Sequence, residues 1–352
     1  MAKITLPDGT SKQVNDGTTV QQLAEQIGPG LARAALAARI DGELSDLSTS
    51  LNKDCDVQLI TSRDPESLEI IRHSCAHIMA EAICRIWPDA RLVYGPVVED
   101  GFYYDIDLDE PIRPSDFERI ESEMKDIAKA DKPVQRREYS REDALKKVEG
   151  DKYKTDNIKR ADSDTISFYS QGEDFEDLCR GPHIPSTSKA GKFKVMSVAG
   201  AYWHGDASQK MLQRVYGTAW HTSKELRSYL HRLEEAKKRD HRLIGRQMQL
   251  FSFHEEGPGF AFMHPSGMVI WNSIVDLWRQ IHEGYGYSEI KTPIILNETL
   301  WHKSGHWDNY QENMYFTDID DVTYAIKPMN CPGGCLVYKS SQHSYREFPK
   351  RI

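Results

Sequence analysis

One long helical stretch, from Pro65 to Trp87, constrains the fold of this chain most, because it runs without a break until Pro88 ends it. The stretch carries His73 and His77. A step of four residues returns to nearly the same face of a helix, so both imidazoles can point into one pocket. The pair does not define a site by itself, because histidines at this spacing are more often ordinary surface or core residues.

A second group of reactive side chains lies far along the chain, in the segment Asp177-Leu-Cys-Arg-Gly-Pro-His183. It places a carboxylate, a thiol and a third imidazole beside a Gly-Pro pair, which can bring backbone close to a ligand. Cys179 and His183 could join the helical pair in a tetrahedral zinc site. The same groups could instead position a water for hydrolysis, with a histidine as general base. Unrelated core residues are the third reading.

The bulk properties limit the class of protein. A length of 352 residues predicts two or three domains, each with its own core. No apolar run approaches the roughly 18 residues of a membrane span, and the N-terminus lacks the apolar core of a signal peptide, so we expect a cytoplasmic chain without a membrane partner. The six cysteines show no framework spacing and indicate thiols or ligands rather than disulfides. A net charge of −9 argues against a protein that binds nucleic acid over its whole surface, but not against a local basic groove.

The first module, residues 1–62, contains two hairpin signals around one helix. Asp8-Gly9 and Asp41-Gly42 favour tight turns between β-prone segments, and a helical pattern that starts at Val20 is stopped by Gly28. We therefore predict a small mixed sheet with a packed helix, a β-grasp fold. The segment resembles the TGS module found in threonyl-tRNA synthetases, some GTPases and alarmone synthetases. It shows no convergent set of titratable residues, which indicates a binding or spacer domain.

Several short motifs occur in order in the second module, residues 63–223. They are His73-Ser-Cys-Ala-His77, Gly95-Pro-Val, Gly101-Phe-Tyr-Tyr-Asp105, Asp177-Leu-Cys-Arg-Gly-Pro-His183 and Ala199-Gly-Ala-Tyr-Trp203. Together they resemble the editing domain of bacterial threonyl-tRNA synthetases, an α+β fold. A similar His and Cys arrangement holds zinc in the editing domains of alanyl-tRNA synthetases. The resemblance to the threonyl enzymes instead implies hydrolysis of seryl-tRNA by a positioned water without a required metal.

The resemblance also implies roles for single residues. His73 and Lys154 would handle the water, although Lys154 could also be an exposed lysine in a basic stretch. The remaining residues would shape the pocket and hold the serine moiety and the terminal adenosine. These are His77, Tyr104, Asp177, Cys179 and His183.

A physical argument explains why a threonyl enzyme would need an editing domain. Serine is threonine without one methyl group, and a missing methyl costs a binding site only about 1–3 kcal/mol, or roughly 10- to 200-fold in discrimination. Translation needs more than that. A second site that hydrolyses the wrong product supplies the difference.

The third module, residues 247–352, resembles the catalytic domain of class II synthetases. A helix with Ile270, Ile274, Trp278 and Ile281 on one face leads to Gly284-Tyr-Gly-Tyr-Ser-Glu-Ile-Lys-Thr-Pro293, which resembles motif 1, the dimer-forming element. The segments Ser304-Gly-His-Trp-Asp-Asn-Tyr310 and Lys327-Pro-Met-Asn-Cys-Pro-Gly333 resemble the threonyl enzyme in particular. This implies that Met329 lines the threonine pocket. It also implies that Cys331 is one of three ligands of a Zn²⁺ ion, which would bind the amino and hydroxyl groups of threonine.

A basic segment joins the second and third modules at residues 224–246. Ser223 can cap a helix with Leu226, Leu230 and Leu233 on one face, and its lysines and arginines outnumber its acidic residues. Contact with a tRNA backbone and a solvated connecting helix are equally good readings. The family resemblance implies a tRNA-binding set at Tyr216, Lys237, Lys238 and Arg239.

The expected fold class is therefore α+β multidomain: a TGS β-grasp domain, an α+β editing domain, a linker helix and an incomplete class II antiparallel sheet. The resemblance reaches Ile352, before motif 2. The family's ATP and Mg²⁺ ligands in motifs 2 and 3, and the two histidines that would complete the zinc site of Cys331, are therefore expected to be missing. We expect no threonyl-adenylate formation, retained editing, and poor order in residues 247–352.

Three functions remain open at this point. The first is a threonine-tRNA ligase chain that edits seryl-tRNA(Thr) and has tRNA(Thr), threonine and serine as partners. The second is a zinc hydrolase that acts on another substrate. The third is a non-enzymatic RNA-binding protein with a TGS domain.

Overall fold

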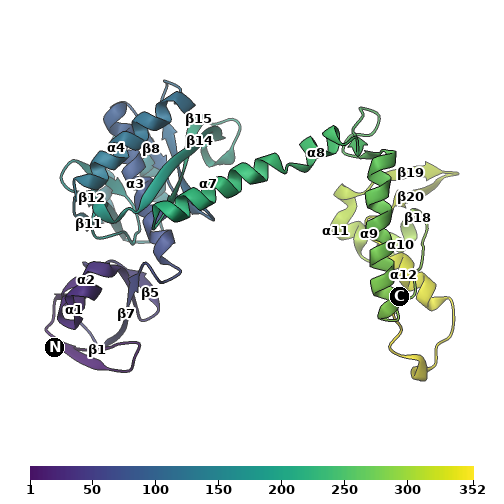
Figure 1. The fold of residues 1–352 in the computed structure, drawn as a ribbon, viewed down its shortest axis with the longest axis horizontal. Coiled ribbons are helices and arrows are strands. Elements are labelled where there is room, and N and C mark those ends of the chain that lie inside the picture. The colour runs from purple at the N-terminus through teal and green to yellow at the C-terminus, as the bar shows by residue number, and fades with distance from the viewer. The chain divides into compact units, whose positions relative to one another are not determined.

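A computed structural model describes all 352 residues. The chain divides into two compact units, Met1–Ala236 and Lys237–Ile352 (Figure 1). It is mixed α and β in composition, with several separate sheets, as the sequence predicts. None of its helices is both long and apolar enough to cross a membrane.

The first domain is a five-stranded sheet with two short helices. The sheet order is β2-β1-β7-β4-β5, with β1 and β7 parallel. Its strands are β1 (Ala2–Thr5), β2 (Ser11–Val14), β4 (Ala35–Ile40), β5 (Glu43–Ser45) and β7 (Cys55–Thr61), and β3 (Thr18–Thr19) pairs with β6 (Ser50–Leu51). The helices are α1 (Val20–Ile27) and α2 (Pro29–Ala34). Val20 and Leu23 of α1 belong to one buried cluster with Ile4 and Val57 of the sheet, which is the core expected of a β-grasp fold.

The two Asp-Gly signals of this domain have different outcomes. Asp41 and Gly42 form a two-residue turn between β4 and β5, and both have positive φ, 50° and 91°. Two positive φ angles define the type I′ turn that the Asp-Gly pair favours. The first turn is longer than predicted, because β1 and β2 pair only up to Thr5 and Ser11 and the loop between them is closed by the Gly9 N–H donating to the Leu6 carbonyl.

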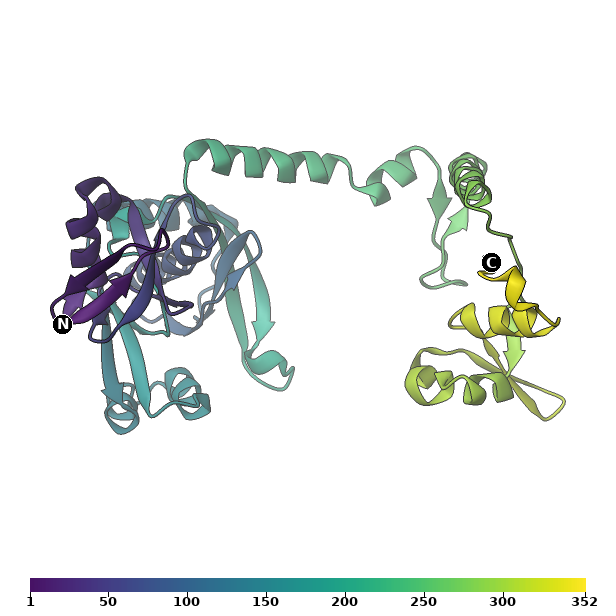
Figure 2. The same ribbon diagram turned by 90° about the horizontal axis from the view of Figure 1, so that it is seen from below.

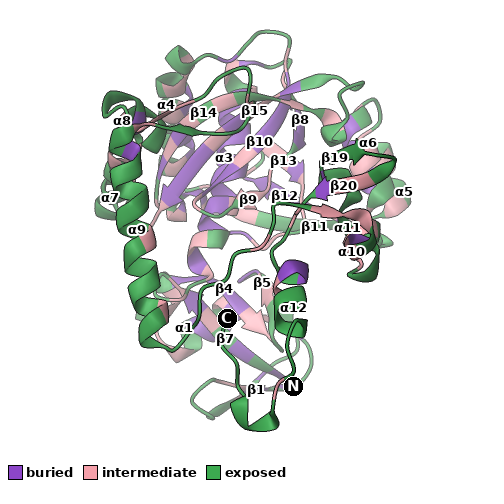
Figure 3. Ribbon diagram, turned by 90° about the vertical axis from the view of Figure 1, so that its right-hand side faces the viewer, coloured by how far each residue is buried: buried purple, intermediate pink, exposed green.

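The second domain is built around α3 (Ser67–Ile86), the long helix predicted from the sequence. This helix and α4 (Phe117–Lys129) pack against a sheet of order β14-β15-β10-β8, and β9 pairs with β10. The strands are β8 (Arg91–Tyr94), β9 (Val97–Val98), β10 (Gly101–Asp107), β14 (Lys192–Tyr202) and β15 (Met211–Trp220). Figure 3 shows α3 and the central strands as mostly buried. The residues of α3 from Ser74 to Ile83 are all buried, so the helix is fixed on every face by the core.

A second sheet of this domain leads into the loop that contains Cys179 and His183, here called the reactive loop. It consists of β11 (Val134–Ser140), β12 (Thr165–Gln171) and β13 (Phe175–Leu178), in that order. The connection from β11 to β12 contains α5 (Arg141–Lys147) and α6 (Lys152–Arg160), which Figure 2 shows at the outer end of these strands. The chain leaves β13 at Cys179 and enters the loop with Gly181, Pro182 and His183.

The predicted linker helix over residues 224–246 is interrupted. The structure has α7 (Ser223–Lys238) followed by α8 (His241–Gln247). Asp240 begins the second helix, because its carboxylate accepts the backbone N–H of Arg242 at 2.8 Å. The predicted cap at Ser223 is also wrong by one residue: the Thr222 hydroxyl accepts the Glu225 N–H at 3.2 Å, and the Glu225 carboxylate accepts the Thr222 N–H at 3.0 Å.

The second unit has a small core. Trp301, Met314 and Ala325 are buried together, beside a three-stranded antiparallel sheet of order β18-β20-β19. Its strands are β16 (Phe251–Ser252), β17 (Phe262–Met263), β18 (Ile295–Asn297), β19 (Phe316–Ile319) and β20 (Val322–Ile326). Its longer helices are α9 (Pro265–Gly284), α10 (Glu298–Lys303), α11 (His306–Tyr310) and α12 (Cys331–Lys339). The predicted apolar face of α9, including Ile274 and Trp278, is exposed.

Candidate active site

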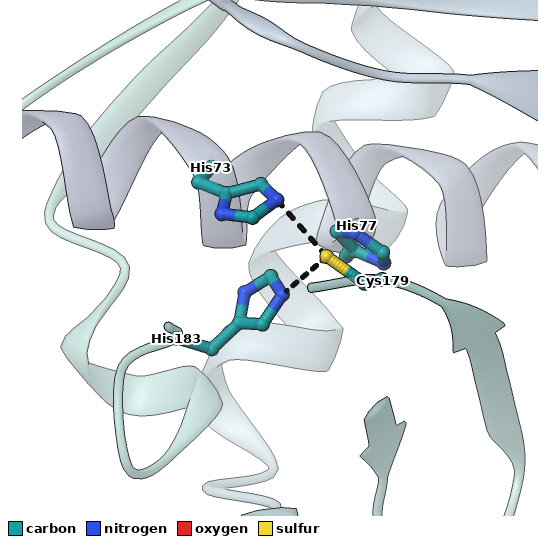
Figure 4. A group of neighbouring side chains, drawn as sticks. All are labelled: His73, His77, Cys179 and His183. Carbon is teal, nitrogen blue, oxygen red and sulfur yellow. Dashed lines mark hydrogen bonds between the residues drawn. The ribbon is translucent and has the colours of Figure 1, made fainter. Parts of the chain in front are cut away.

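Two distant segments of the chain meet in the second domain. His73 and His77 come from successive turns of α3, and Cys179 and His183 come from the loop after β13. Figure 4 shows the four side chains facing one another, and one donor atom from each lies within 4.8 Å of all the others. The Cys179 Sγ is 3.1 Å from the His73 Nε2 and 3.2 Å from the His183 Nε2. The structure therefore brings together the two motifs that the sequence left apart.

The tautomer of His183 follows from its neighbour Ser74. The Ser74 hydroxyl has one proton, which it donates to the Ile70 carbonyl at 2.8 Å. The hydroxyl must then accept from the His183 Nδ1, which lies 3.1 Å away, so Nδ1 carries the proton. The Nε2 of a neutral His183 is left as a bare acceptor that faces Cys179.

The cluster holds more acceptors than donors at neutral pH. Burial lowers the pKa of His73 to about 4 and that of His77 to about 3, and it lowers the pKa of His183 well below its ordinary value. Burial raises the pKa of the Cys179 thiol to about 12, so the thiol keeps its proton. One thiol proton can serve only one of the two imidazole nitrogens that face it. The other nitrogen is left without a donor inside the cluster.

A buried carboxylate, that of Asp177, binds several groups beside the site. Asp177 is 3% exposed and accepts hydrogen bonds from the Lys154 ammonium, the Tyr104 hydroxyl and the Leu178 N–H. Its Oδ2 also lies 3.6 Å from the His77 Nδ1, a buried nitrogen that has no hydrogen-bond partner. Burial alone would raise the pKa of Asp177, but the charge of Lys154 and these contacts outweigh burial and lower it.

Lys154 is not the exposed lysine that its local sequence allowed. It is 8% exposed and its ammonium is paired with Asp177. The side chain lines the same cavity as His73, His77 and Cys179. Its fixed positive charge therefore faces the space in which a ligand would lie.

The cavity has a volume of about 790 Å³ and extends well beyond the histidine cluster. Burial raises the pKa of the Tyr104 hydroxyl in its wall well above the ordinary value, so this group stays a hydrogen-bond donor. Its lining also includes further polar and charged side chains, namely Arg136, Asn157, Arg160, Asp162, Ser163, Thr165, Ser167 and Arg180. The space is large enough for a ligand that extends past the reactive groups.

Three functional contacts escaped the sequence analysis. Ser74 fixes His183, but a serine inside a helix carries no local signal of this role. Asp46 of the first domain accepts the His183 backbone N–H at 2.9 Å and the Tyr169 hydroxyl at 2.6 Å. A single aspartate in a turn resembles any turn residue. Only the packing of the two domains reveals its target.

The other predicted site residues lie elsewhere. Tyr216 is on β15, half-buried, with its ring centre 5.6 Å from that of Tyr103. The basic residues Lys237 and Lys238 end α7 and are exposed, as is Arg239. Met329 and Cys331 are in the second unit, where the Met329 Sδ lies 3.3 Å from the His306 Nε2.

A zinc ion does not fit either candidate site well. Cys331 is exposed at the start of α12, and the cluster around Cys179 is the one group of three or more potential ligand residues in the structure. The ligand types of that cluster, three imidazoles and a thiol, are types that zinc binds. A tetrahedral ion would separate sulfur from nitrogen by about 3.6 Å, given Zn–S of about 2.3 Å and Zn–N of about 2.0–2.1 Å. The observed separations of 3.1 and 3.2 Å match direct hydrogen bonds instead.

Comparison with known proteins identifies the chain. Residues 2–61 match the TGS domain, and residues 166–216 match the threonyl and alanyl tRNA synthetase second additional domain. The threonine-tRNA ligase of Acetivibrio thermocellus is 53% identical over 100% of this chain and 56% of the relative, and that of Desulfosudis oleivorans is 51% identical over 100% and 55%. A solved RNA binding domain of threonyl-tRNA synthetase from Cryptosporidium parvum matches 32% of this chain and 28% of that chain, with 40% identity and a TM-score of 0.31.

The two domain matches and the curated relatives show a chain similar to aminoacyl-tRNA synthetases that carries an editing-type domain. The relatives that match along the whole of this chain are threonine-tRNA ligases. The chain spans just over half the length of the curated relatives that it matches.

The buried histidines predict a pH-dependent stability. Their folded pKa values lie below the ordinary value of 6.5, so below pH 6.5 the unfolded chain binds protons that the native chain excludes. The free energy of unfolding should therefore fall as the pH is lowered from about 7 towards 4. Urea denaturation at several pH values measures this, and His77→Phe should give a shallower dependence. A flat profile between pH 7 and 5 would contradict the neutral, buried imidazoles.

Proposed function

We propose that the second domain hydrolyses seryl-tRNA(Thr), as the editing site of a threonyl-tRNA synthetase. The observation that carries the proposal is the meeting of His73 and His77 with Cys179 and His183 beside one open cavity. The similarity of the chain to threonine-tRNA ligases supports the choice of substrate. The outer, polar part of the cavity has room for the terminal nucleotide of the tRNA, and the inner part for the seryl group.

In this proposal His73 holds the attacking water. Its imidazole is neutral at pH 7 and lines the cavity, so it accepts a hydrogen bond from a water that attacks the ester carbonyl. The C–O bond to the ribose breaks and the water proton passes to the ribose oxygen. A pKa of about 4 makes His73 a weak base, which favours orientation of the water over complete proton removal before attack.

Lys154 stabilises the developing charge. Its ammonium is held by Asp177 and cannot move freely, which is the preorganised arrangement that lowers the energy of an oxyanion. Cys179, His77 and His183 set the shape of the inner pocket, and Tyr104 with Asp177 would bind the polar groups of serine. A pocket closed around serine rejects the extra methyl of threonine, as a second sieve requires.

The whole protein's activity is part of the same proposal. The full enzyme would charge tRNA(Thr) with threonine, using ATP and Mg²⁺, and Met329 and Cys331 would lie at its threonine pocket, with Cys331 as a Zn²⁺ ligand. Cys331 belongs to no group of three or more potential metal ligands in this structure, so the residues present do not form that zinc site. The basic end of α7 and Tyr216 would contact the tRNA, and motif 1 would join two copies.

The direct test incubates the chain with seryl-tRNA(Thr) and threonyl-tRNA(Thr) and measures release of each amino acid. We expect rapid release of serine, slow release of threonine, and no threonine-dependent pyrophosphate exchange. Equal rates for the two aminoacyl groups would contradict the editing function.

A zinc hydrolase is less well supported than the editing site, because the sulfur–nitrogen separations of the four converging residues match direct hydrogen bonds. Metal analysis separates the two functions. One zinc ion per chain that is lost in Cys179→Ser would favour the hydrolase. Hydrolysis of seryl-tRNA(Thr) that survives extraction with a chelator would favour the water-based site.

A further inference from the structure

A carboxylate of the first domain lies against the reactive loop of the second. Asp46 follows β5 in the connection to β6 and is 6% exposed. Its Oδ1 accepts the backbone N–H of His183 at 2.9 Å, and its Oδ2 accepts the hydroxyl of Tyr169 at 2.6 Å. One side chain of the first domain thus fixes two groups beside the candidate active site.

Tyr169 transmits the second of these contacts to the loop. Its ring centre lies 4.5 Å from that of His183 in an edge-on arrangement. A Cβ atom added to Gly181 would lie 1.9 Å from the Tyr169 hydroxyl oxygen, so the phenol rests directly on the loop backbone. The loop between Cys179 and His183 is therefore supported both through its backbone amide and through the ring that covers it.

The electrostatic surroundings of Asp46 include a cation on the cavity wall, Arg136, although the ion pair of Arg136 is with Glu138. Burial raises the pKa of Asp46, whereas the hydrogen bonds from His183 and Tyr169 and the charge of Arg136 lower it. Arg136 lines the same cavity as the histidine cluster. The two carboxylate oxygens of Asp46 each accept from a different donor, which explains why an aspartate occupies this position.

We propose that Asp46 is a positioning residue for the hydrolysis, and that the first domain is a structural part of the editing site rather than a spacer. By holding the His183 amide, Asp46 fixes where the His183 Nε2 and the Cys179 Sγ lie relative to the two histidines of α3. This inference rests on the proposed function. It adds a residue that touches neither substrate nor water.

The test compares Asp46→Ala with Asp46→Asn in seryl-tRNA(Thr) hydrolysis. The alanine variant leaves the His183 N–H and the Tyr169 hydroxyl without an acceptor, and small displacements of reactive groups cost up to about 100-fold. We expect kcat to fall about 10- to 100-fold with little change in KM. The asparagine variant keeps an acceptor for the His183 N–H, so its kcat should stay within about 3-fold of the wild type.

A matched control is Asp56→Ala, which removes an exposed carboxylate from the same domain. Its kcat and KM should both remain unchanged. A raised KM with unchanged kcat in Asp46→Ala would indicate a binding role and overturn the inference, as would unchanged values of both. A wild-type chain that does not hydrolyse seryl-tRNA(Thr) would refute the proposed function instead, so the two failures are distinguishable.

Tyr169→Phe keeps the test decisive if Asp46→Ala does not fold. It removes one hydroxyl and retains the ring against His183. We expect kcat to fall less in Tyr169→Phe than in Asp46→Ala. In the double variant with Asp46→Asn, the effect on kcat should be smaller than the sum of the two single effects, because both groups act on one loop. Full activity in Tyr169→Phe together with additive effects would overturn the inference.

Discussion

Replacing His73 by alanine should reduce the hydrolysis of seryl-tRNA(Thr) by about 100- to 10,000-fold, the range lost when a positioned acid or base is removed. The imidazole is neutral at pH 7, lies 3.1 Å from the Cys179 sulfur and lines the cavity. His183 cannot take its place, because His183 is buried and does not line the cavity. His77 lines the cavity, but its Nδ1 faces Asp177. Single-turnover release of labelled serine measures the effect.

A matched control for His73→Ala is His231→Ala, which removes an exposed imidazole from α7. Its hydrolytic rate constant should equal that of the wild type. Binding of seryl-tRNA(Thr) by His73→Ala should remain within a few-fold of the wild type. A loss of less than about 10-fold in hydrolysis would rule out the proposed role, since it falls below the ordinary range for acid–base groups.

Replacing Asp177 by alanine should cost about 3–5 kcal/mol in the free energy of unfolding, the typical result of breaking a buried ion pair by removing one partner. The Lys154 ammonium would remain buried without its counter-charge, and the Tyr104 hydroxyl and the Leu178 N–H would lose their acceptor. Denaturant unfolding of the chain measures the loss. Hydrolysis should disappear as well, because the Lys154 ammonium that faces the cavity is no longer held in place by Asp177.

The double variant Asp177→Asn with Lys154→Met provides the internal check. It removes both charges together, so part of the lost stability should return while hydrolysis does not. The exposed pair of Lys146 and Glu142 supplies a control, and Lys146→Ala should change stability by less than about 0.5 kcal/mol. Equal costs for the buried and exposed pairs would show that Asp177 does not hold a buried charge.

Sequence periodicity could predict one half of the active site. Two histidines four residues apart on an unbroken helix must share a face, and α3 confirms this. Periodicity could not show that the loop after β13 meets that face, because 106 residues separate His73 from Cys179. That meeting depends on how two sheets pack, and only the family resemblance indicated it beforehand.

Other features depended on partners far away in the chain. Lys154 lies among charged residues that indicate an exposed helix, and it is buried only because Asp177 supplies a counter-charge. The connecting helix looked continuous because its helical pattern persists across Asp240, whose capping contact a periodicity argument does not detect. The contact of Asp46 with His183 joins residues 137 positions apart.

Because α3 is buried on every face, the geometry of the candidate site depends on the packing of the whole domain. The neighbours of both histidines, including Ser74, Cys75, Ala76 and Ile78, are interior residues, so the imidazoles are aimed by the same packing that holds the domain together. A change that rotates the helix to alter the active site would have to rebuild the whole interior. Adaptation of the proposed editing site to another ester should therefore proceed through exposed residues that line the cavity, such as Asp162 and Arg180, rather than through α3.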